Sequence, residues 1–128
     1  MSYCFIREVD RSFEEAIEAV TEQLKERGFG VLTRIDVKDT LKKKIDVDFR
    51  PYVILGACNP EFAHRALSME PNIGVMLPCN VIVQQAQGGK VQVAAVDPVA
   101  SMQAVDNPEL GELAGEVRNL LKQAVEAV

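Results

Sequence analysis

Apolar residues recur at helical spacing in two segments, one after Ser12 and one after Asn107. Ser12 and Glu15 have the spacing of a capping box, in which a hydroxyl and a carboxylate satisfy free amides at a helix start. Gly28 supplies a left-handed stop for this helix, and Asn107 followed by proline is typical of a second helix start. The predicted apolar faces are Phe13, Ile17, Val20 and Leu24 in the first helix, and Leu110, Leu113, Ala114, Val117, Leu121 and Val125 in the second.

Short runs rich in apolar and β-branched residues predict three strands: Tyr3 to Val9, Phe29 to Asp36, and Tyr52 to Cys58. Two short helices are predicted between or after them. Asp36 is placed to cap a helix through Leu41 to Ile45, and Asn59 before Pro60 predicts a helix to about Met69. Phe62, Ala63, Ala66 and Leu67 would form its apolar face.

The odd-numbered residues from Ile73 to Val83 are apolar, which predicts one long strand, or two pieces joined at Pro78. Proline cannot donate a ladder hydrogen bond, so Pro78 marks an edge or a bulge. Gly88 and Gly89 form a turn into a last strand, Lys90 to Val96. A three-residue loop from Gly88 to Lys90 keeps the apolar faces together, and it pairs Val81 with Ala95 and Val83 with Val93.

Five strands and two main helices predict an α+β fold, an antiparallel five-stranded sheet with helices on one face and short extra helices. The length of 128 residues is typical of one domain. We therefore expect a single domain over residues 1–128, with no internal boundary or repeat.

The formal net charge of −5 argues against nucleic acid as a partner, because phosphate backbones are bound chiefly by clustered Lys and Arg. No stretch has the length of a signal core or a membrane span, so we expect a cytoplasmic protein with no membrane association. Three cysteines in a chain of this size are expected to be reduced thiols rather than a disulfide framework.

Two Cys-Asn dipeptides are the most chemically distinctive feature of the sequence. Cys58 precedes a predicted helix start, where amides and the helix dipole favour a thiolate, so it is the candidate nucleophile; its alternative is a small buried residue that ends a strand. Cys79 falls in the apolar phase of its strand, which predicts a core position unless a bulge at Pro78 turns it toward a site.

The remaining candidate ligands are two amides and the single histidine. Asn59 is either a helix cap or a ligand, whereas Asn80 lies within an apolar strand and must be exposed or hydrogen-bonded. His64 lies at the border of the apolar face of its helix. Together with Cys58 and Cys79 it could bind zinc or another transition metal; otherwise it is a partly exposed surface histidine.

Several ordered motifs resemble the domain of unknown function 302 family over about Tyr3 to Met102. They are G-F-G-V-L-T-R-I-D-V at Gly28 to Val37, L-G-A-C-N-P at Leu55 to Pro60, L-P-C-N-V at Leu77 to Val81, and V-D-P at Val96 to Pro98. The resemblance implies a family core over residues 1–104, followed by an amphipathic helix over residues 105–128. It also implies a TATA-box-binding-protein-like fold, strand, helix, four strands, helix. No settled activity comes with it, and fold alone does not imply DNA binding.

Three functional hypotheses follow. The first is a binding or sensing module with a cysteine-lined pocket for a metal or small ligand, formed where Cys58 and Cys79 approach each other beneath the helix that begins at Pro60. It requires their strands to be neighbours. The second is a thiol-dependent enzyme or redox protein with Cys58 as nucleophile and His64 as base. The third is a homodimer formed through the sheet or the final helix, without small-molecule chemistry.

Overall fold

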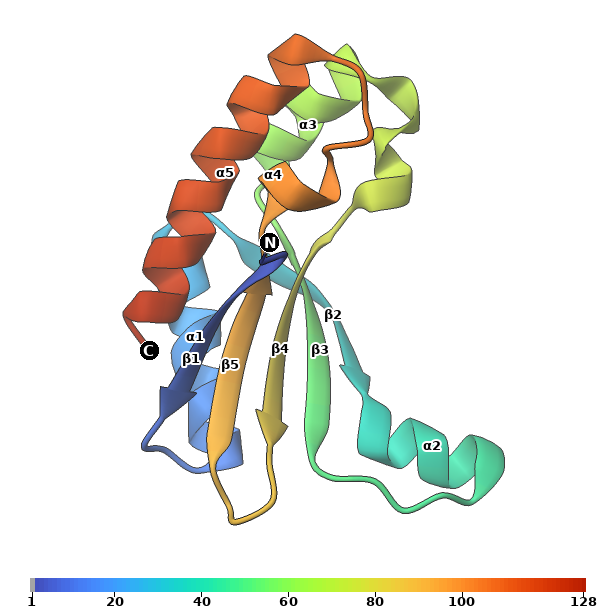
Figure 1. Cartoon of the computed structure of the whole chain (residues 1–128), viewed down its shortest axis with the longest axis vertical. Coiled ribbons are helices and arrows are strands. Elements are labelled where there is room, and N and C mark those ends of the chain that lie inside the picture. The colour runs from blue at the N-terminus through green and yellow to red at the C-terminus, as the bar shows by residue number, and fades with distance from the viewer. Residues whose placement is uncertain (1) are drawn as a thin grey trace.

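The computed structural model describes residues 2–128 and is an antiparallel five-stranded sheet with helices, so the predicted α+β class is confirmed (Figure 1). The strand order is β1-β5-β4-β3-β2, and every neighbouring pair is antiparallel. The strands are β1 Cys4–Val9, β2 Gly30–Asp36, β3 Tyr52–Cys58, β4 Cys79–Gln85 and β5 Val91–Val96. The helices are α1 Phe13–Glu26, α2 Val37–Ile45, α3 Pro60–Met69, α4 Pro98–Ser101 and α5 Pro108–Glu126, with a 3-10 helix, η1, at Pro71–Met76.

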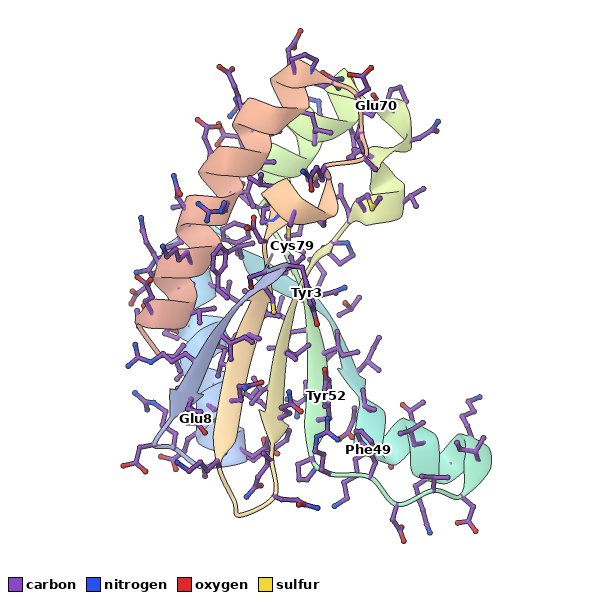
Figure 2. All side chains as sticks on the ribbon, in the orientation of Figure 1. Tyr3, Glu8, Phe49, Tyr52, Glu70 and Cys79 are labelled. Atoms are coloured by element: carbon purple, nitrogen blue, oxygen red, sulfur yellow. The ribbon has the colours of Figure 1, made fainter. Side chains whose placement is uncertain are left out.

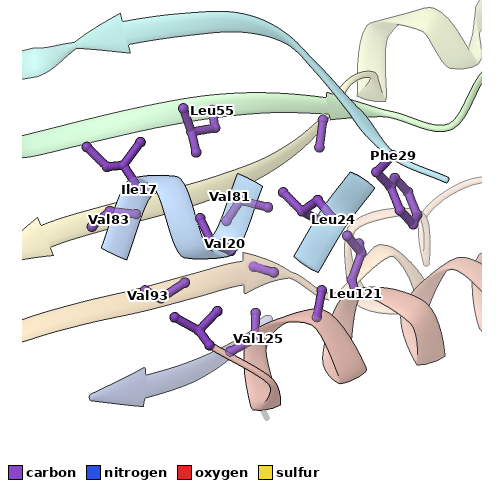
Figure 3. Packing of buried hydrophobic residues seen from close by; sticks show 14 of the residues in the cluster. Ile17, Val20, Leu24, Phe29, Leu55, Val81, Val83, Val93, Leu121 and Val125 are labelled. Atoms are coloured by element: carbon purple, nitrogen blue, oxygen red, sulfur yellow. The ribbon is translucent and has the colours of Figure 1, made fainter. Parts of the chain in front are cut away.

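The main hydrophobic core lies between one face of the sheet and the two long helices, α1 and α5 (Figure 3). Side chains alternate between the two faces of a strand, so every second residue of β3, β4 and β5 points into this layer. The buried strand residues include Leu55, Val81, Val83 and Val93, and the helices contribute Ile17, Val20, Leu24, Leu121 and Val125. The apolar faces predicted for both helices are thus confirmed, except that Phe13 is only partly buried.

The helix starts confirm most of the predicted caps. Both hydrogen bonds of the capping box between Ser12 and Glu15 are formed, and Asn59 accepts a hydrogen bond from the backbone amide of Phe62. Asn107 is different, because its side chain makes no capping hydrogen bond and instead donates to the carbonyl of Met69 at 3.1 Å. This residue therefore fastens the start of α5 to the end of α3.

The predicted strand from Ile73 is wrong in its first half. Residues Pro71–Met76 form η1, and β4 begins only at Cys79. The alternation has another cause here, since Ile73 is buried among helices while Val75 is 84% exposed. The predicted hairpin register is confirmed, with Val81 opposite Ala95 and Val83 opposite Val93.

A smaller hydrophobic cluster holds together α3, η1, α4 and the beginning of α5, which we call the helical lobe. Its buried residues are Ala66, Ile73, Leu110 and Leu113. The lobe lies beyond the end of the sheet at which β3 finishes and β4 starts (Figure 1). Across residues 2–128, no helix combines the length and the apolar character needed to span a membrane.

Candidate functional site

A cavity of about 370 Å³ lies between the main core and the helical lobe. Its walls come from segments far apart in the sequence: the ends of β3 and β4, helix α3, and the first half of α5. The sheet side includes Phe29, Ala57 and Cys79, and the lobe side includes Phe62, Ala66 and Leu110. The cavity is thus a gap left where two separately packed clusters meet.

The sheet topology brings Cys58 and Cys79 to this cavity. β3 ends at Cys58, β4 begins at Cys79, and the two strands are antiparallel neighbours with Ala57 directly opposite Cys79. Both cysteines line the cavity. The condition set by the leading hypothesis, neighbouring strands, is therefore met. Figure 2 shows Cys79 where the strands meet the helical lobe.

The two thiols have different surroundings. Cys79 is 8% exposed, whereas Cys58 is half-buried. Burial, together with a smaller contribution from the neighbouring Cys58, raises the pKa of the Cys79 thiol to about 11. Because the thiolate is the form that binds metals and attacks electrophiles, Cys79 is held in its unreactive form at neutral pH. Of the two thiols on this wall, Cys58 is therefore the candidate reactive group.

Asn59 also lines the cavity, and its side chain is held from two directions. Its Oδ1 accepts a hydrogen bond of 3.2 Å from the backbone amide of Phe62, which caps α3. Its Nδ2 lies against Gly28, where a Cβ would come within 2.9 Å. Gly28 also has a φ of +85°, a conformation that favours glycine. The capping role of Asn59 thereby fixes one part of the wall.

The other two predicted site residues do not line the cavity. Asn80 follows Cys79 on β4 and therefore points to the opposite face of the sheet, where it is exposed and opposite Gly56. His64 is exposed on α3. Within residues 2–128, no group of three or more His, Cys, Asp or Glu side chains is arranged to hold a metal ion. The sequence-based ligand set Cys58, Cys79 and His64 is therefore not assembled.

Several wall residues had no signal in the local sequence pattern. Pro98, Met102 and Leu110 reach the cavity from segments more than thirty residues after Cys58, and Leu32 and Thr33 reach it from β2. Leu32 and Leu67 are 68% and 43% exposed, so they lie where the cavity opens to solvent. A glycine in an otherwise apolar strand, Gly56, could have indicated the close approach of Thr33.

The fold and the site together define a class of protein: an α+β domain with an apolar cavity where two strand ends meet a helical lobe. The chain belongs to the family described as "Domain of unknown function DUF302", whose model matches residues 5–128. This confirms the resemblance, and the matched range includes α5.

Among solved structures, the chain is similar over nearly its whole length to the crystal structure of an uncharacterized conserved protein DUF302 from Bacillus stearothermophilus. It has 31% sequence identity and a TM-score of 0.93, and the match covers 99% of this chain and 98% of that one. No curated protein matches.

Proposed function

We propose that this protein binds a small, mainly apolar molecule in the cavity beside Cys58 and Cys79, as a binding or sensing module. The observation that carries this proposal is the cavity itself: about 370 Å³ lined almost entirely by apolar side chains. Pockets for small molecules are typically about 300–1,000 Å³ and mostly apolar, with a few polar groups.

The polar groups on the wall limit the ligand further. They come from Thr33, Asn59, Cys58 and Cys79, and among residues 2–128 no charged side chain lines the cavity. An unpaired charge is costly to bury in such surroundings. The buried part of the ligand is therefore uncharged, and any charged end extends past Leu32 and Leu67 into solvent.

This proposal fits the positions of the side chains better than the metal and enzyme hypotheses do. The metal hypothesis needs three ligands together, and His64 is not with the cysteines. The enzyme hypothesis needs a base within hydrogen-bond reach of Cys58, and His64 is exposed outside the cavity. Three free cysteines also suit a reducing compartment, so we propose a cytoplasmic location.

The test is titration with N-phenyl-1-naphthylamine, an uncharged apolar fluorophore. We expect saturable binding to the reduced protein. Ala63 lines the cavity and Ser68 is exposed on the same helix, so Ala63→Phe fills the site while Ser68→Phe leaves it open. We expect Ala63→Phe to weaken binding at least about tenfold, a change of about 1.4 kcal/mol, and Ser68→Phe to bind like the wild type.

Circular dichroism would verify that both variants are folded. Absence of saturable binding to the wild type, or equal affinity in a folded Ala63→Phe variant, would overturn the proposal.

A further inference from the structure

The face of the sheet opposite α1 and α5 carries an unbroken apolar row across all five strands. The row consists of Ile6, Ala94, Ile82, Ile54 and Ile35, and each residue lies directly opposite the next in the strand register. Directly opposed residues of antiparallel strands share a face. This row is the second apolar layer of the sheet, and it packs against none of the helices of the main core.

The row is open to solvent at both ends. Ile6 is 58% exposed and Ile35 is 48% exposed, whereas Ala94 is only 3% exposed. Ala94 is small, lies between Ile6 and Ile82 and is already covered, so the isoleucines carry the accessible surface of the row. Figure 1 has this face toward the viewer, with α1 behind the sheet. Contiguous apolar surface of this kind marks interaction sites on soluble proteins.

We propose that this face packs against the same face of a second copy of the chain. Two sheets that pack face to face keep their strands within about 30° of each other. A two-fold axis along the strands reverses the order of the row, so β1 of one subunit lies over the β3 and β2 side of the other. The isoleucines of the two rows, Ile6, Ile82 and Ile54 among them, then face one another across the axis.

The neighbouring row supplies charge complementarity for this arrangement. It runs Glu8, Gln92, Gln84 and Tyr52 across the sheet. Arg50 stacks over the Tyr52 ring and donates to Gln84, so a positive charge lies at the β3 side while Glu8 lies at the β1 side. Figure 2 shows Glu8 at the β1 edge of the sheet and Tyr52 on β3, several strands away. This reversal brings Glu8 of each subunit toward Arg50 of the partner subunit, so the interface holds two such charge pairs.

The competing contact of Glu8 is weak. Lys90 approaches it at 4.0 Å, and both side chains are largely exposed, an arrangement that contributes little in water. Glu8 is therefore available to a second cation.

The area is sufficient for a modest dimer. Five strands spaced by about 4.8 Å and about six residues long give a face of about 24 by 20 Å, on the order of 500 Å² per subunit. The total of about 1,000 Å² reaches the lower limit for a specific interface. We therefore expect a dimer with a dissociation constant in the micromolar range.

Sedimentation velocity between about 1 and 100 µM, a range suited to micromolar affinity, tests the proposal. The wild type is expected to move from the mass of one 14.1 kDa chain toward twice that mass. Ile6→Glu should stay monomeric throughout. Val75→Glu makes the same change at an exposed apolar residue of the helical lobe, and it should dimerise like the wild type.

Charge exchange tests the direction of packing. Glu8→Arg and Arg50→Glu should each weaken association at least about tenfold, and the double variant should restore it. A wild type that remains monomeric at about 100 µM, a dimer indifferent to Ile6→Glu, or a double variant no better than the single ones would overturn the proposal. Dye binding in the cavity is a separate readout, so failure of the dimer and failure of the proposed function are distinguishable.

Discussion

Gly56 lies directly opposite Thr33 in the pairing of β3 with β2, and the Thr33 hydroxyl occupies the space that a side chain on Gly56 would need. The ring of Pro78 closes in from the other side, with Cγ 2.8 Å from where a Cβ would lie. Thr33 and Pro78 both line the cavity. The missing side chain at Gly56 thus allows two wall residues to meet over the strand.

Gly56→Ala should destabilise the protein by about 1–3 kcal/mol, because the added methyl forces Thr33 and Pro78 apart in a tightly packed region. Gly111 in α5 is the matched control, since a Cβ there meets no atom within 4 Å. Gly111→Ala should stabilise by about 0.5–1 kcal/mol, as alanine is the better helix former. Urea unfolding of the two variants decides the point, and equal effects would contradict it.

Asn→Asp substitutions should have different effects on stability at the two Asn-Pro helix starts. Asn59 uses its oxygen as an acceptor for the Phe62 amide, so Asn59→Asp keeps the cap and adds a favourable charge at the helix start. Asn107 uses its nitrogen as a donor to the carbonyl of Met69 and to Glu70. Asn107→Asp removes that donor and adds a like charge.

We expect Asn107→Asp to cost about 1–3 kcal/mol and Asn59→Asp to change stability by less than about 0.5 kcal/mol. Thermal unfolding at neutral pH measures both. A larger loss at Asn59 than at Asn107 would show that these roles are assigned the wrong way round.

Asp97 joins β5 to the helical lobe. It is nearly buried, its Oδ1 accepts from the Val99 amide at the start of α4, and its Oδ2 accepts from Arg118 of α5 at 3.1 Å. Asp97→Ala removes both contacts and should lower the free energy of unfolding by about 2 kcal/mol. Asp106→Ala, at an exposed aspartate, should change it by less than about 0.5 kcal/mol. Chemical unfolding of the two variants would test this, and similar losses would refute the role given to Asp97.

The raised pKa of Cys79 predicts a loss of stability in alkali. Burial raises that pKa from 9.0 to about 11, so below about pH 9 the thiol is protonated in both the folded and unfolded chains. Between about pH 9 and 11 the unfolded chain releases this proton while the folded protein keeps it. The free energy of unfolding should therefore fall, by at most about 1.4 kcal/mol per pH unit.

Urea unfolding at several pH values from 8 to 10.5, a range chosen to span the shift, measures this slope. Cys79→Ala should have a shallower slope than the wild type, and the parallel comparison cancels contributions from lysines and tyrosines. Equal slopes would mean that the Cys79 thiol titrates alike in the folded and unfolded chains.

The false strand from Ile73 shows where pattern alone fails. Period-two alternation is ambiguous over a few residues. Ile73 satisfies it while facing the small core of the helical lobe, to which the distant Leu110 and Leu113 contribute. The hairpin from β4 to β5 shows the opposite case. Its register follows from keeping apolar residues on one face, so Val81 opposite Ala95 could be deduced without tertiary information.

The sequence by itself determined the elements whose signals are local: the capping box at Ser12, the Asn59-Pro60 helix start, the hairpin register and the α+β class. These depend on hydrogen bonds and periodicities that span a few residues. Only the tertiary structure decided which candidate residues meet. Strand order places Cys58 beside Cys79, the alternation of β4 sends Asn80 to the other face, and the packing of α3 leaves His64 in solvent. Because the cavity is the space between two cores, no local pattern encodes it.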